Sequence, residues 1–533
     1  MRKSRNLVGK LDFAITKFVC DLFREKLHTS WLAAVWCAGF LVGVGLSASD
    51  FSRNFVGWYW FVISILFLIL SLISRLKIVL VAVLISGILL GIGRGTLSQN
   101  SIANYREYIG HTVTVEAKVG DDPGVGSNGD TSLKLIDIKL QLAGSNKFIS
   151  LDSGQIFASV NSGNQDIERS DQVQITGKLS SGFGDFAAAL DYGQLQKITT
   201  FSGADPALEL RDSFGLKLRS VVPSPAADLG MGILAGQKTA LPSAISAAFI
   251  AASLTHIVVA SGYNLTILIR FARRLFAKIS RFVALAMSGL LVFAFANVTG
   301  FSPSMTRASL VAGLSLLAWY YGRKFHPVVI LLLAASITVA IDPSYLWGDA
   351  GWWMSFTSFA GVLIFAPLVK SFFWGDKIEF REKRLSKFSR NAKKPDSIEK
   401  KHVLRQIFIE TLSAQLMSAP IIALMMGQFS PYGLIANLLV LPVLPLAMLM
   451  TFCAGIGAFI LPTFFAKLVA LPATWLLNYA INIAKWIANL PGASQSVSFG
   501  IWPTIGLFFA ILLSIVWMKL RTRHSFYGDN LVE

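Results

Sequence analysis

The sequence predicts a polytopic α-helical membrane protein with about 12 transmembrane helices and one small β-barrel outside the membrane. Of its 533 residues, 54% are hydrophobic and only 15% are charged, whereas soluble proteins average about 25% charged residues. The apolar residues occur in uncharged runs close to or above the roughly 20 residues that a helix needs to cross about 30 Å of hydrocarbon. Such runs are helical, because backbone in lipid must satisfy its own hydrogen bonds. The clearest runs are 31–49, 55–73, 282–300, 350–369, 432–461 and 499–518.

The order of apolar, charged and polar segments predicts five parts. We expect a cytoplasmic leader with three transmembrane helices in 1–98, an extracytoplasmic barrel in 99–204, an amphipathic connector in 205–228, a second membrane domain in 229–520 and a cytoplasmic tail in 521–533. The first apolar run and its leader are both longer than those of an ordinary signal peptide. The run is therefore interpreted as a retained helix.

Basic residues predict the orientation, because cytoplasmic loops of membrane proteins are enriched in lysine and arginine. Basic residues precede the first apolar run, the most basic loop lies at 376–405, and Lys519, Arg521 and Arg523 follow the last run. These clusters place both termini on the cytoplasmic side of the cytoplasmic membrane. The same rule accounts for much of the net charge of +18, so that charge is weak evidence for nucleic-acid binding.

Between residues 105 and 200 the pattern changes to short segments in which apolar and polar residues alternate. Segments 111–119, 132–142, 155–160 and 172–179 fit β-strands, separated by turn clusters rich in Asp, Asn and Gly. About five strands in such a segment predict a small barrel or sandwich, and the oligonucleotide-binding (OB) barrel is one candidate.

A nucleic-acid surface on this domain is the less favoured interpretation. Acidic side chains outnumber basic ones between 100 and 200, the opposite of what phosphate neutralisation requires. The candidates for DNA contact are Lys134, Lys139, Lys147 and Lys178, which could still form one basic face. The candidates for base stacking are Phe148, Phe157, Phe183, Phe186 and Tyr192. Aromatic residues of a small barrel more often fill its core, however.

The second membrane domain is first interrupted by polar residues at 229–237 and 254–265. Glycine, proline and serine residues break the helical pattern there, and His256, Ser261 and Asn264 place polar groups at membrane depth. Polar residues at that depth often mark cavities or pathways. Close packing between helices at small residues is the alternative explanation, and the sequence favours neither.

A second interruption lies at 297–308. Its polar residues before the break are Asn297 and Thr299. We expect one helix to end at Gly300 and the next to begin with Ser302 as N-cap and Pro303 in its first turn. Arg307 then lies one turn inside, where it either extends to the outer interface or faces an aqueous lumen. An arginine on the outer side departs from the positive-inside trend, which favours a functional role.

A third interruption lies at 413–445. Its helix-breaking residues are Pro420, Pro431, Pro442 and Pro445. Irregular backbone at membrane depth is tolerated where it is buried in protein or lines a water-filled cavity. Gln415 and Asn437 are neutral amides that can meet a phosphate group. Because broken helices are typical of transporter sites, the segment indicates a conduit without identifying its cargo.

Together these segments resemble the ComEC family of competence proteins. Residues 256–265 are similar to the family's HLLAISGLHV-like stretch, and its TGxxPSxxRA element is matched by Thr299, Pro303, Ser304, Arg307 and Ala308. Residues 342–356 follow a DPxxLxDxGFxLSF-like stretch, and 413–445 match the closing SAQL-to-LVLPLVP pattern almost continuously. The resemblance covers roughly 229–518 and keeps the order of the family's elements. Tyr263 and Asn264 replace a Leu-His pair of the family, and Trp352 replaces a phenylalanine.

The resemblance implies that 229–520 is a channel that passes one strand of incoming DNA to the cytoplasm during natural transformation. It also implies an OB-like domain where the barrel is predicted. The pore candidates are then His256, Ser261, Asn264, Asn297, Thr299, Ser302, Arg307, Gln415 and Asn437. The implied partners are single-stranded DNA, a separate cytoplasmic ATPase or helicase, a DNA-capture apparatus and a separate nuclease.

The sequence predicts neither an enzyme nor a cofactor. Many family members carry a C-terminal metallo-β-lactamase-like domain, and the form without it is expected here because no HxHxDH cluster occurs. The 3 cysteines and 6 histidines show no metal-ligand spacing, and there is no Gly-rich phosphate-binding loop.

Two other functions stay open on the sequence. The chain could be a transporter of another solute on the same scaffold, which a closed pocket at mid-membrane would favour. It could also be a non-conducting scaffold whose outer domain binds partners, which a tightly packed apolar bundle would favour.

Overall fold

The computed structural model describes two compact units. The described residues are 29–48, 59–73, 79–125, 130–143, 147–151, 154–160, 167–199, 205–237, 241–258, 262–300, 303–322, 326–373, 396–425, 427–496 and 500–522. One unit comprises Met1–Glu107 with Val328–Gly348, and the other comprises Tyr108–Pro327 with Asp349–Glu533. Ser261 and Ser302, both pore candidates, lie outside the described residues.

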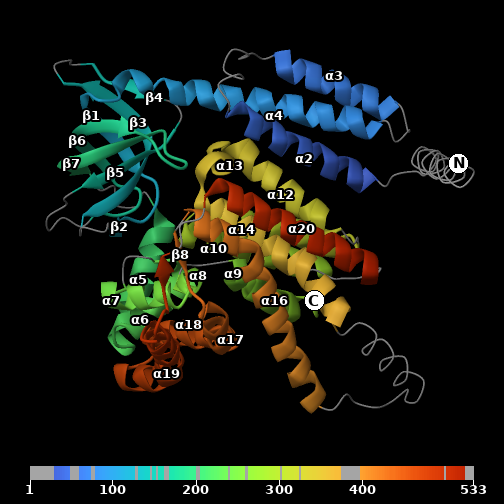
Figure 1. Ribbon diagram of the computed structural model, residues 1–533. Helices are drawn as coiled ribbons and strands as arrows, with labels where there is room; N and C mark the ends of the chain where they lie inside the picture. Colours follow the sequence, from blue (N-terminus) through green and yellow to red (C-terminus); the bar gives the residue numbers. More distant parts are fainter. Residues whose placement is uncertain are drawn as a thin grey trace, which may run out of the picture. The chain divides into compact units, whose positions relative to one another are not determined.

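The first unit is helical (Figure 1). Its helices are α2 (Thr29–Ser47), α3 (Tyr59–Ile73), α4 (Val79–Ala103), α12 (Pro327–Ile341) and α13 (Ser344–Gly348). Helix α4 packs against both α2 and α3. Between α3 and α4, the hydroxyls of Ser64 and Ser86 each donate to the other residue's carbonyl oxygen at 2.8 Å. Arg94 of α4 donates to the carbonyl oxygens of Ala340 and Ile341 at the end of α12.

Glycines set the distance between α2 and α4. A Cβ atom on Gly43 of α2 would overlap the carbonyl oxygen of Ile88, and one on Gly91 of α4 would overlap that of Phe40. Gly39 and Gly87 make equivalent approaches one turn earlier on each helix. Small residues spaced by four allow helix backbones to meet closely in membranes, where packing and not hydrophobicity drives association.

We predict that Gly43→Ala lowers the unfolding free energy of the purified protein by roughly 1–3 kcal/mol, because the added methyl group forces the two backbones apart. Gly45→Ala is the matched control on the same helix, since its Cβ would lie 3.9 Å from the nearest atom, in Leu346. Denaturant titration in detergent measures both variants. Equal stability of the two variants would show that the close approach does not stabilise the unit.

The second unit contains a small barrel of five long strands. They are β1 (Thr112–Val119), β3 (Thr131–Leu142), β5 (Ile156–Val160), β6 (Gln172–Ser181) and β7 (Ala188–Thr199), with the short strands β2 (Gly124–Val125) and β4 (Ile149–Leu151) paired to β3. The order around the barrel is β1-β3-β5-β7-β6, and β6 pairs with β1 to close it. Only the β5–β7 pair among these is parallel. The predicted small barrel is confirmed.

Aliphatic residues fill the barrel, which corrects the preference for an aromatic core. Inward positions alternate along each strand, as with Val113 and Val115 of β1 or Leu133 and Leu135 of β3, and all are almost completely buried. The five aromatic residues considered above, Phe148, Phe157, Phe183, Phe186 and Tyr192, are half-buried or exposed. They lie outside because branched aliphatic side chains already occupy the inward positions of the strands.

Helices form the rest of the second unit. The connector is α5 (Pro206–Val221), and the short helices α6 (Ala226–Ala235), α7 (Ser243–Ala251) and α8 (Thr255–Val258) follow it. The others are α9 (Gly262–Phe276), α10 (Arg281–Thr299), α11 (Pro303–Tyr320), α14 (Ala350–Ala360), the π-helical η3 (Gly361–Phe365), α16 (Asp396–Met425), α17 (Gly433–Val440), α18 (Leu444–Ile460), α19 (Thr463–Ala488) and α20 (Ile501–Thr522). The hairpin of β8 (Gln428–Phe429) and β9 (Gln495–Ser496) completes the unit.

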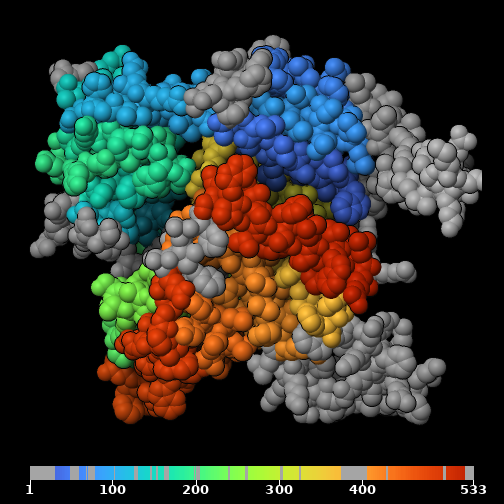
Figure 2. All heavy atoms as spheres, in the orientation of Figure 1, coloured from blue at the N-terminus to red at the C-terminus, as the bar shows by residue number. Residues whose placement is uncertain are grey.

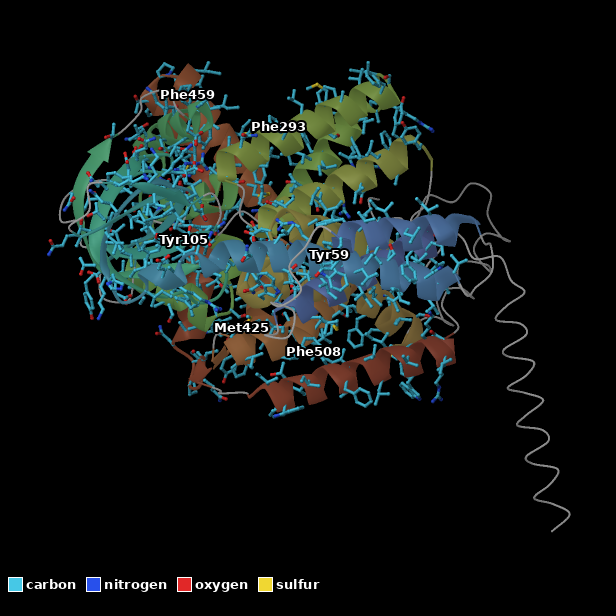
Figure 3. The ribbon with its side chains drawn as sticks, turned by 90° about the horizontal axis from the view of Figure 1, so that it is seen from above. Tyr59, Tyr105, Phe293, Met425, Phe459 and Phe508 are labelled. Carbon is cyan, nitrogen blue, oxygen red and sulfur yellow. The ribbon has the colours of Figure 1, made fainter. Side chains whose placement is uncertain are left out.

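Seven described helices are long and apolar enough to cross a membrane, or up to eight if the bent pair α17–α18 is one span. The expected number of about twelve is therefore not confirmed. Large apolar side chains point outward from these helices: Phe293 of α10 is 64% exposed and Phe459 of α18 is 50% exposed, and Figure 3 labels both. Trp502 of α20 is 83% exposed, and Figure 2 shows α20 in red on the visible face. These surfaces are typical of a membrane protein.

The prolines interrupt helices at some positions and not at others. Helix α11 begins at Pro303, while Pro442 and Pro445 lie at the 51° bend between α17 and α18. The break expected at Pro420 is not found, since α16 continues through it to Met425. Membrane helices tolerate an internal proline where neighbouring groups satisfy the backbone that it frees.

Candidate functional site

The three polar interruptions lie on helices that form a chain of neighbours, each packed against the next. Helix α9 contacts α11, α11 contacts α14, α14 contacts α16, and α16 contacts α17. Helices α6 and α7 both contact α8. The fold therefore gathers segments that lie up to about 200 residues apart in the chain into one cluster of helices, the polar helix cluster.

Arg307 lies within this cluster and is buried, with only 9% of the residue exposed. Its Nη1 donates to the backbone carbonyl oxygen of Ser355 on α14 at 2.6 Å. The guanidinium lies over two aromatic rings of the same helix, 5.8 Å from the centroid of Phe356 and 5.6 Å from that of Phe359. Its Nε is buried and has no hydrogen-bond partner among the described residues. Arg307 therefore points inward and does not extend to an interface.

Asn264 is a packed residue. It is completely buried, and its Nδ2 donates to the carbonyl oxygen of Ile233 on α6 at 2.9 Å. Nearby, a Cβ on Gly232 would overlap the carbonyl oxygen of Val258 on α8. Helix packing is thus the better explanation for this part of the first interruption.

His256 differs from Asn264 because its side chain is exposed. Thr255 beside it is also exposed, and Tyr263 at the start of α9 is 43% exposed. Asn297 is a half-buried residue whose side chain donates to the carbonyl oxygen of Phe293. Thr299 donates to the carbonyl oxygen of Phe295 one turn earlier. The amide of Asn297 and the hydroxyl of Thr299 thus bond within their own helix.

Two amide oxygens of the third interruption are buried without a hydrogen-bond partner among the described residues: Oε1 of Gln415 on α16 and Oδ1 of Asn437 on α17. The hydroxyl of Ser413 is likewise buried and has no hydrogen-bond partner among the described residues. Gln415 lies where α17 begins, since a Cβ on Gly433 would come 2.8 Å from its Nε2 and 2.8 Å from Cβ of Ser253. Unpaired buried polar atoms are rare in proteins and call for an explanation.

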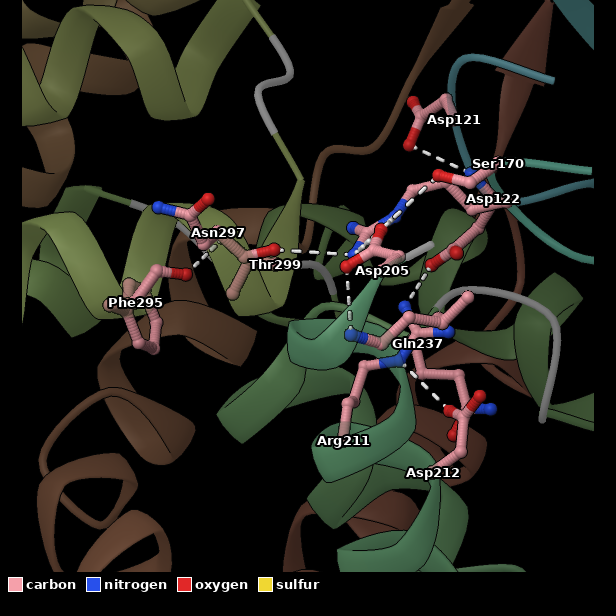
Figure 4. Close-up of polar contacts among 12 residues, drawn as sticks. Asp121, Asp122, Ser170, Asp205, Arg211, Asp212, Gln237, Phe295, Asn297 and Thr299 are labelled. Carbon is pink, nitrogen blue, oxygen red and sulfur yellow. Dashed lines mark hydrogen bonds and ion pairs between the residues drawn. The ribbon is translucent and has the colours of Figure 1, made fainter. Parts of the chain in front are cut away.

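A group of ion pairs joins the barrel to the helices, and the sequence did not single it out (Figure 4). Arg169 of the barrel contacts the carboxylate of Asp205 at 2.9 Å and donates to the carbonyl oxygen of Asn297 at 3.3 Å. Arg211 of α5 pairs with Asp122 of the barrel. Both arginines are at most 7% exposed. We use the name ionic junction for the contacts of Arg169 and Arg211, together with those of Arg219 described in the next paragraph.

Helix α5 extends the ionic junction to α6. Arg219, two turns beyond Arg211, donates to Asp228 of α6 at 2.9 Å and to the side-chain oxygen of Gln237 at 3.1 Å. Asp228 also accepts a hydrogen bond from Ser224. The spacing of eight residues between Arg211 and Arg219 in a short amphipathic helix is one sequence signal of this arrangement, and the nearby Asp212 and Asp228 are another. The third partner, Asp122, lies 89 residues from Arg211 and gives no such signal.

The junction controls the charge state of Asp205. Burial alone would raise the pKa of this carboxyl group. Hydrogen bonds from the Leu208 N–H, Arg169 and Ser170, together with the charge of Arg169, outweigh burial and lower the pKa below its usual range. For Arg211, burial is likewise outweighed by Asp122 and Asp212, which raise the pKa of its guanidinium.

We predict that Asp205→Asn lowers stability at neutral pH by roughly 2–4 kcal/mol, because it leaves the buried Arg169 without a carboxylate. The folded-state pKa of Asp205 lies below the unfolded value of about 3.9, so its carboxylate stabilises the fold above roughly pH 4. That contribution is lost as the pH falls through the folded-state pKa. Thermal unfolding from pH 7 to 3 should therefore show a flatter pH dependence in the variant.

The matched control for this variant is Asp212→Asn. Asp212 is 31% exposed, and its partner Arg211 keeps Asp122. A smaller loss of stability is therefore expected. An equal loss in both variants would contradict a special role for the Arg169–Asp205 pair.

The four candidate lysines of the barrel differ in their surroundings. Lys134 pairs with Asp185 at 3.5 Å and lies 5.8 Å from the ring centroid of Phe186. The other three candidates, Lys139, Lys147 and Lys178, are exposed. Beside Lys134, the rings of Phe157, Phe183 and Phe186 lie within 5.2–5.5 Å of one another, centroid to centroid. We call these three rings the aromatic triad.

No group of three or more His, Cys, Asp or Glu side chains able to hold a metal ion occurs among the described residues. The charged clusters of the second unit are instead Arg–Asp pairs that satisfy one another. The described side chains of the second unit therefore offer polar and cationic contacts to a ligand.

Comparison with known proteins gives one finding. The model of a protein family described as "Competence protein" matches residues 233–523, which is more than half of the chain. Searches of the curated proteins and of the solved structures give no significant match.

Proposed function

Because the chain belongs to the competence-protein family, whose description indicates a role in DNA uptake during transformation, we propose that it is a channel for single-stranded DNA in the cytoplasmic membrane. The observation that carries this proposal is Arg307, a buried cation inside a helix cluster of that family region with no carboxylate partner among the described residues. A polyanion crossing lipid needs such polar and weakly basic contacts along its path.

The barrel is proposed to receive the strand outside the membrane. A five-stranded barrel whose strand order is β1-β3-β5-β7-β6 has the Greek-key connectivity of the OB fold, which binds oligonucleotides on its second and third strands and the loop between its last two. Lys134 lies on the second long strand and Phe157 on the third, while Phe183 and Phe186 lie between β6 and β7. The aromatic triad therefore occupies the surface where such barrels stack bases.

A route from this surface into the membrane domain is supported by Asp349. This residue caps α14 by accepting a hydrogen bond from the Trp352 N–H, and it lies close enough to Asp185 and Lys134 to experience their charges. Helix α14 also carries Ser355, the partner of Arg307. One helix thus connects the surroundings of the aromatic triad with the buried guanidinium.

The partners proposed for the channel follow from what the sequence lacks. No Gly-rich phosphate-binding loop and no metal-binding nuclease motif occur in the printed sequence. We therefore assign the driving force to a separate cytoplasmic ATPase or helicase, and degradation of the other strand to a separate nuclease. The chain itself acts as conduit and not as enzyme.

Transport of another solute is the second candidate. It is favoured by the 51° bend between α17 and α18 and by the buried amide oxygens of Gln415 and Asn437, which have no hydrogen-bond partner in the described part of the chain. Broken helices with free polar groups are typical of transporter sites. A solute transporter, however, would not require the barrel for activity. The dependence of uptake on the aromatic triad therefore separates the two functions.

We predict that deletion of the gene abolishes natural transformation while DNA still binds to the cell exterior. Labelled DNA that stays accessible to added nuclease in the deletion strain, and becomes protected in the parent strain, is the expected result. Re-expression from a plasmid is the control and should restore transformation. Unchanged transformation in the deletion strain would remove the DNA channel as the function.

We predict that Phe183→Ala weakens binding of a fluorescent oligothymidylate by the purified full-length protein about tenfold, because one base–aromatic stack contributes roughly 1–3 kcal/mol. Phe183 is 54% exposed within the aromatic triad, whereas Tyr192 is 90% exposed elsewhere on the barrel. Tyr192→Ala is therefore the matched control and should bind as the wild type does. Equal affinity of all three proteins, measured by fluorescence anisotropy, would exclude stacking on the triad.

A further inference from the structure

Arg307 is the least compensated charge described in the polar helix cluster. It is 91% buried, as its 9% exposure shows, and no ion pair to it occurs among the described residues. The other buried arginines of the second unit differ, since Arg169 and Arg211 both contact carboxylates. A buried charge is unfavourable unless it is paired, so the position of Arg307 requires a reason beyond packing.

The groups around Arg307 hold it in place without neutralising it. The carbonyl oxygen of Ser355 accepts from Nη1, and the rings of Phe356 and Phe359 lie against the guanidinium. The carbonyl group is a dipole and each aromatic ring is a quadrupole. Both orient a cation, but neither carries a net charge. Within the described part of the chain, the Nε–H has no hydrogen-bond partner. The guanidinium is therefore held in one orientation with a donor to spare.

Two hydroxyl groups belong to residues that neighbour this cation, Ser304 on its own helix and Ser355, whose carbonyl oxygen it contacts. Ser304 precedes Arg307 by three residues on α11 and so shares its helix face. Its hydroxyl lies 3.2 Å from the hydroxyl of Ser355. On the other side, α9 approaches at Gly262, where a Cβ would lie 3.4 Å from Nη2 of Arg307. Glycine at this position leaves the guanidinium uncrowded.

We propose that Arg307, with the hydroxyls of Ser304 and Ser355, forms a site for one phosphodiester group inside the membrane domain. This inference rests on the proposed DNA channel and specifies the point at which the strand is held. A phosphodiester carries one negative charge and presents two terminal oxygens, which suit the parallel donors of a guanidinium. Its charge balances the single uncompensated charge of Arg307.

One such site also suits passage of the strand. Several cationic contacts would bind a polyanion tightly, whereas conduction requires that each contact be weak enough to release. Arg307 offers one attractive point, whereas Gln415 and Asn437 of the same polar helix cluster are neutral amides. The strand can therefore exchange one phosphate for the next at Arg307.

Phosphate chemistry is shared by DNA, free phosphate and lipid headgroups, and the test must separate them. The full-length protein is purified in a maltoside detergent, which contains no phosphate. Binding of a fluorescent oligothymidylate is compared with binding of its uncharged methylphosphonate analogue, and inorganic phosphate and a short-chain phosphatidylglycerol serve as competitors. The variant is Arg307→Met, which keeps an unbranched side chain against Phe356 and Phe359 and removes the charge.

We expect Arg307→Met to weaken oligothymidylate binding about tenfold, as loss of a charge-assisted hydrogen bond does. The slope of the logarithm of affinity against that of salt concentration should fall by about 0.7, the value for one phosphate of a single strand. Binding of the uncharged analogue should not change. Arg274→Met is the matched control, since Arg274 is exposed on α9, and it should bind within about twofold of the wild type.

Four results would overturn the proposal. These are unchanged affinity and salt slope in Arg307→Met, equal loss of both oligomers, competition by the lipid alone, and a lower melting temperature accompanied by loss of all binding. The last result would assign Arg307 to the packing of α11 on α14. The deletion experiment tests the channel by a separate readout, so failure of the phosphate site and failure of the channel can be told apart.

Discussion

The cost of removing polar groups from water governs how the parts of this protein are joined. Within a low-dielectric interior, each buried donor, acceptor or charge destabilises the fold unless another group satisfies it. The hydroxyls of Ser64 and Ser86 satisfy this condition mutually between α3 and α4, and Asn264 does so with a carbonyl oxygen of α6. These contacts bind helices together and leave nothing for a ligand. Their role is therefore structural.

The buried arginines show most clearly the difference between a polar group that is satisfied within the fold and one that is not. Arg169 and Arg211 contact carboxylates and thereby connect the barrel, α5 and the end of α10. Among the residues that the structure describes, Arg307 contacts a carbonyl oxygen and two aromatic rings but no carboxylate. The same side chain is thus a structural tie in one place and a candidate ligand-binding group in another. What separates the two roles is whether a counter-charge is present within the fold.

The ionic junction includes the last turn of α10, where the second polar interruption lies. Arg169 contacts the carbonyl oxygen of Asn297 in the last turn of α10, directly before Gly300, whose φ of +83° suits a residue without a side chain. The carboxylate partner of Arg169, Asp205, also caps α5. Arg169 and Asp205 therefore tie the barrel to α5 and to the end of α10, next to the break between α10 and α11. The helix that carries Arg307 begins immediately after that break.

The sequence by itself determined the membrane class, the small barrel and the polar segments of the family region, because hydrophobic run length and period-two alternation are local properties. It could predict that Arg307 lies one turn inside a helix, since Pro303 marks the start of that helix. It could not predict that aliphatic residues fill the barrel and leave Phe157, Phe183 and Phe186 outside, or that α16 continues through Pro420. Only the tertiary structure decided which polar groups are paired. Arg169 contacts Asp205 and Asn297, which lie 36 and 128 residues away, while Arg307 contacts no carboxylate in the described ranges. Pairing depends on which distant side chains the fold brings within about 3 Å of one another. The order of residues along the chain does not predict these distances.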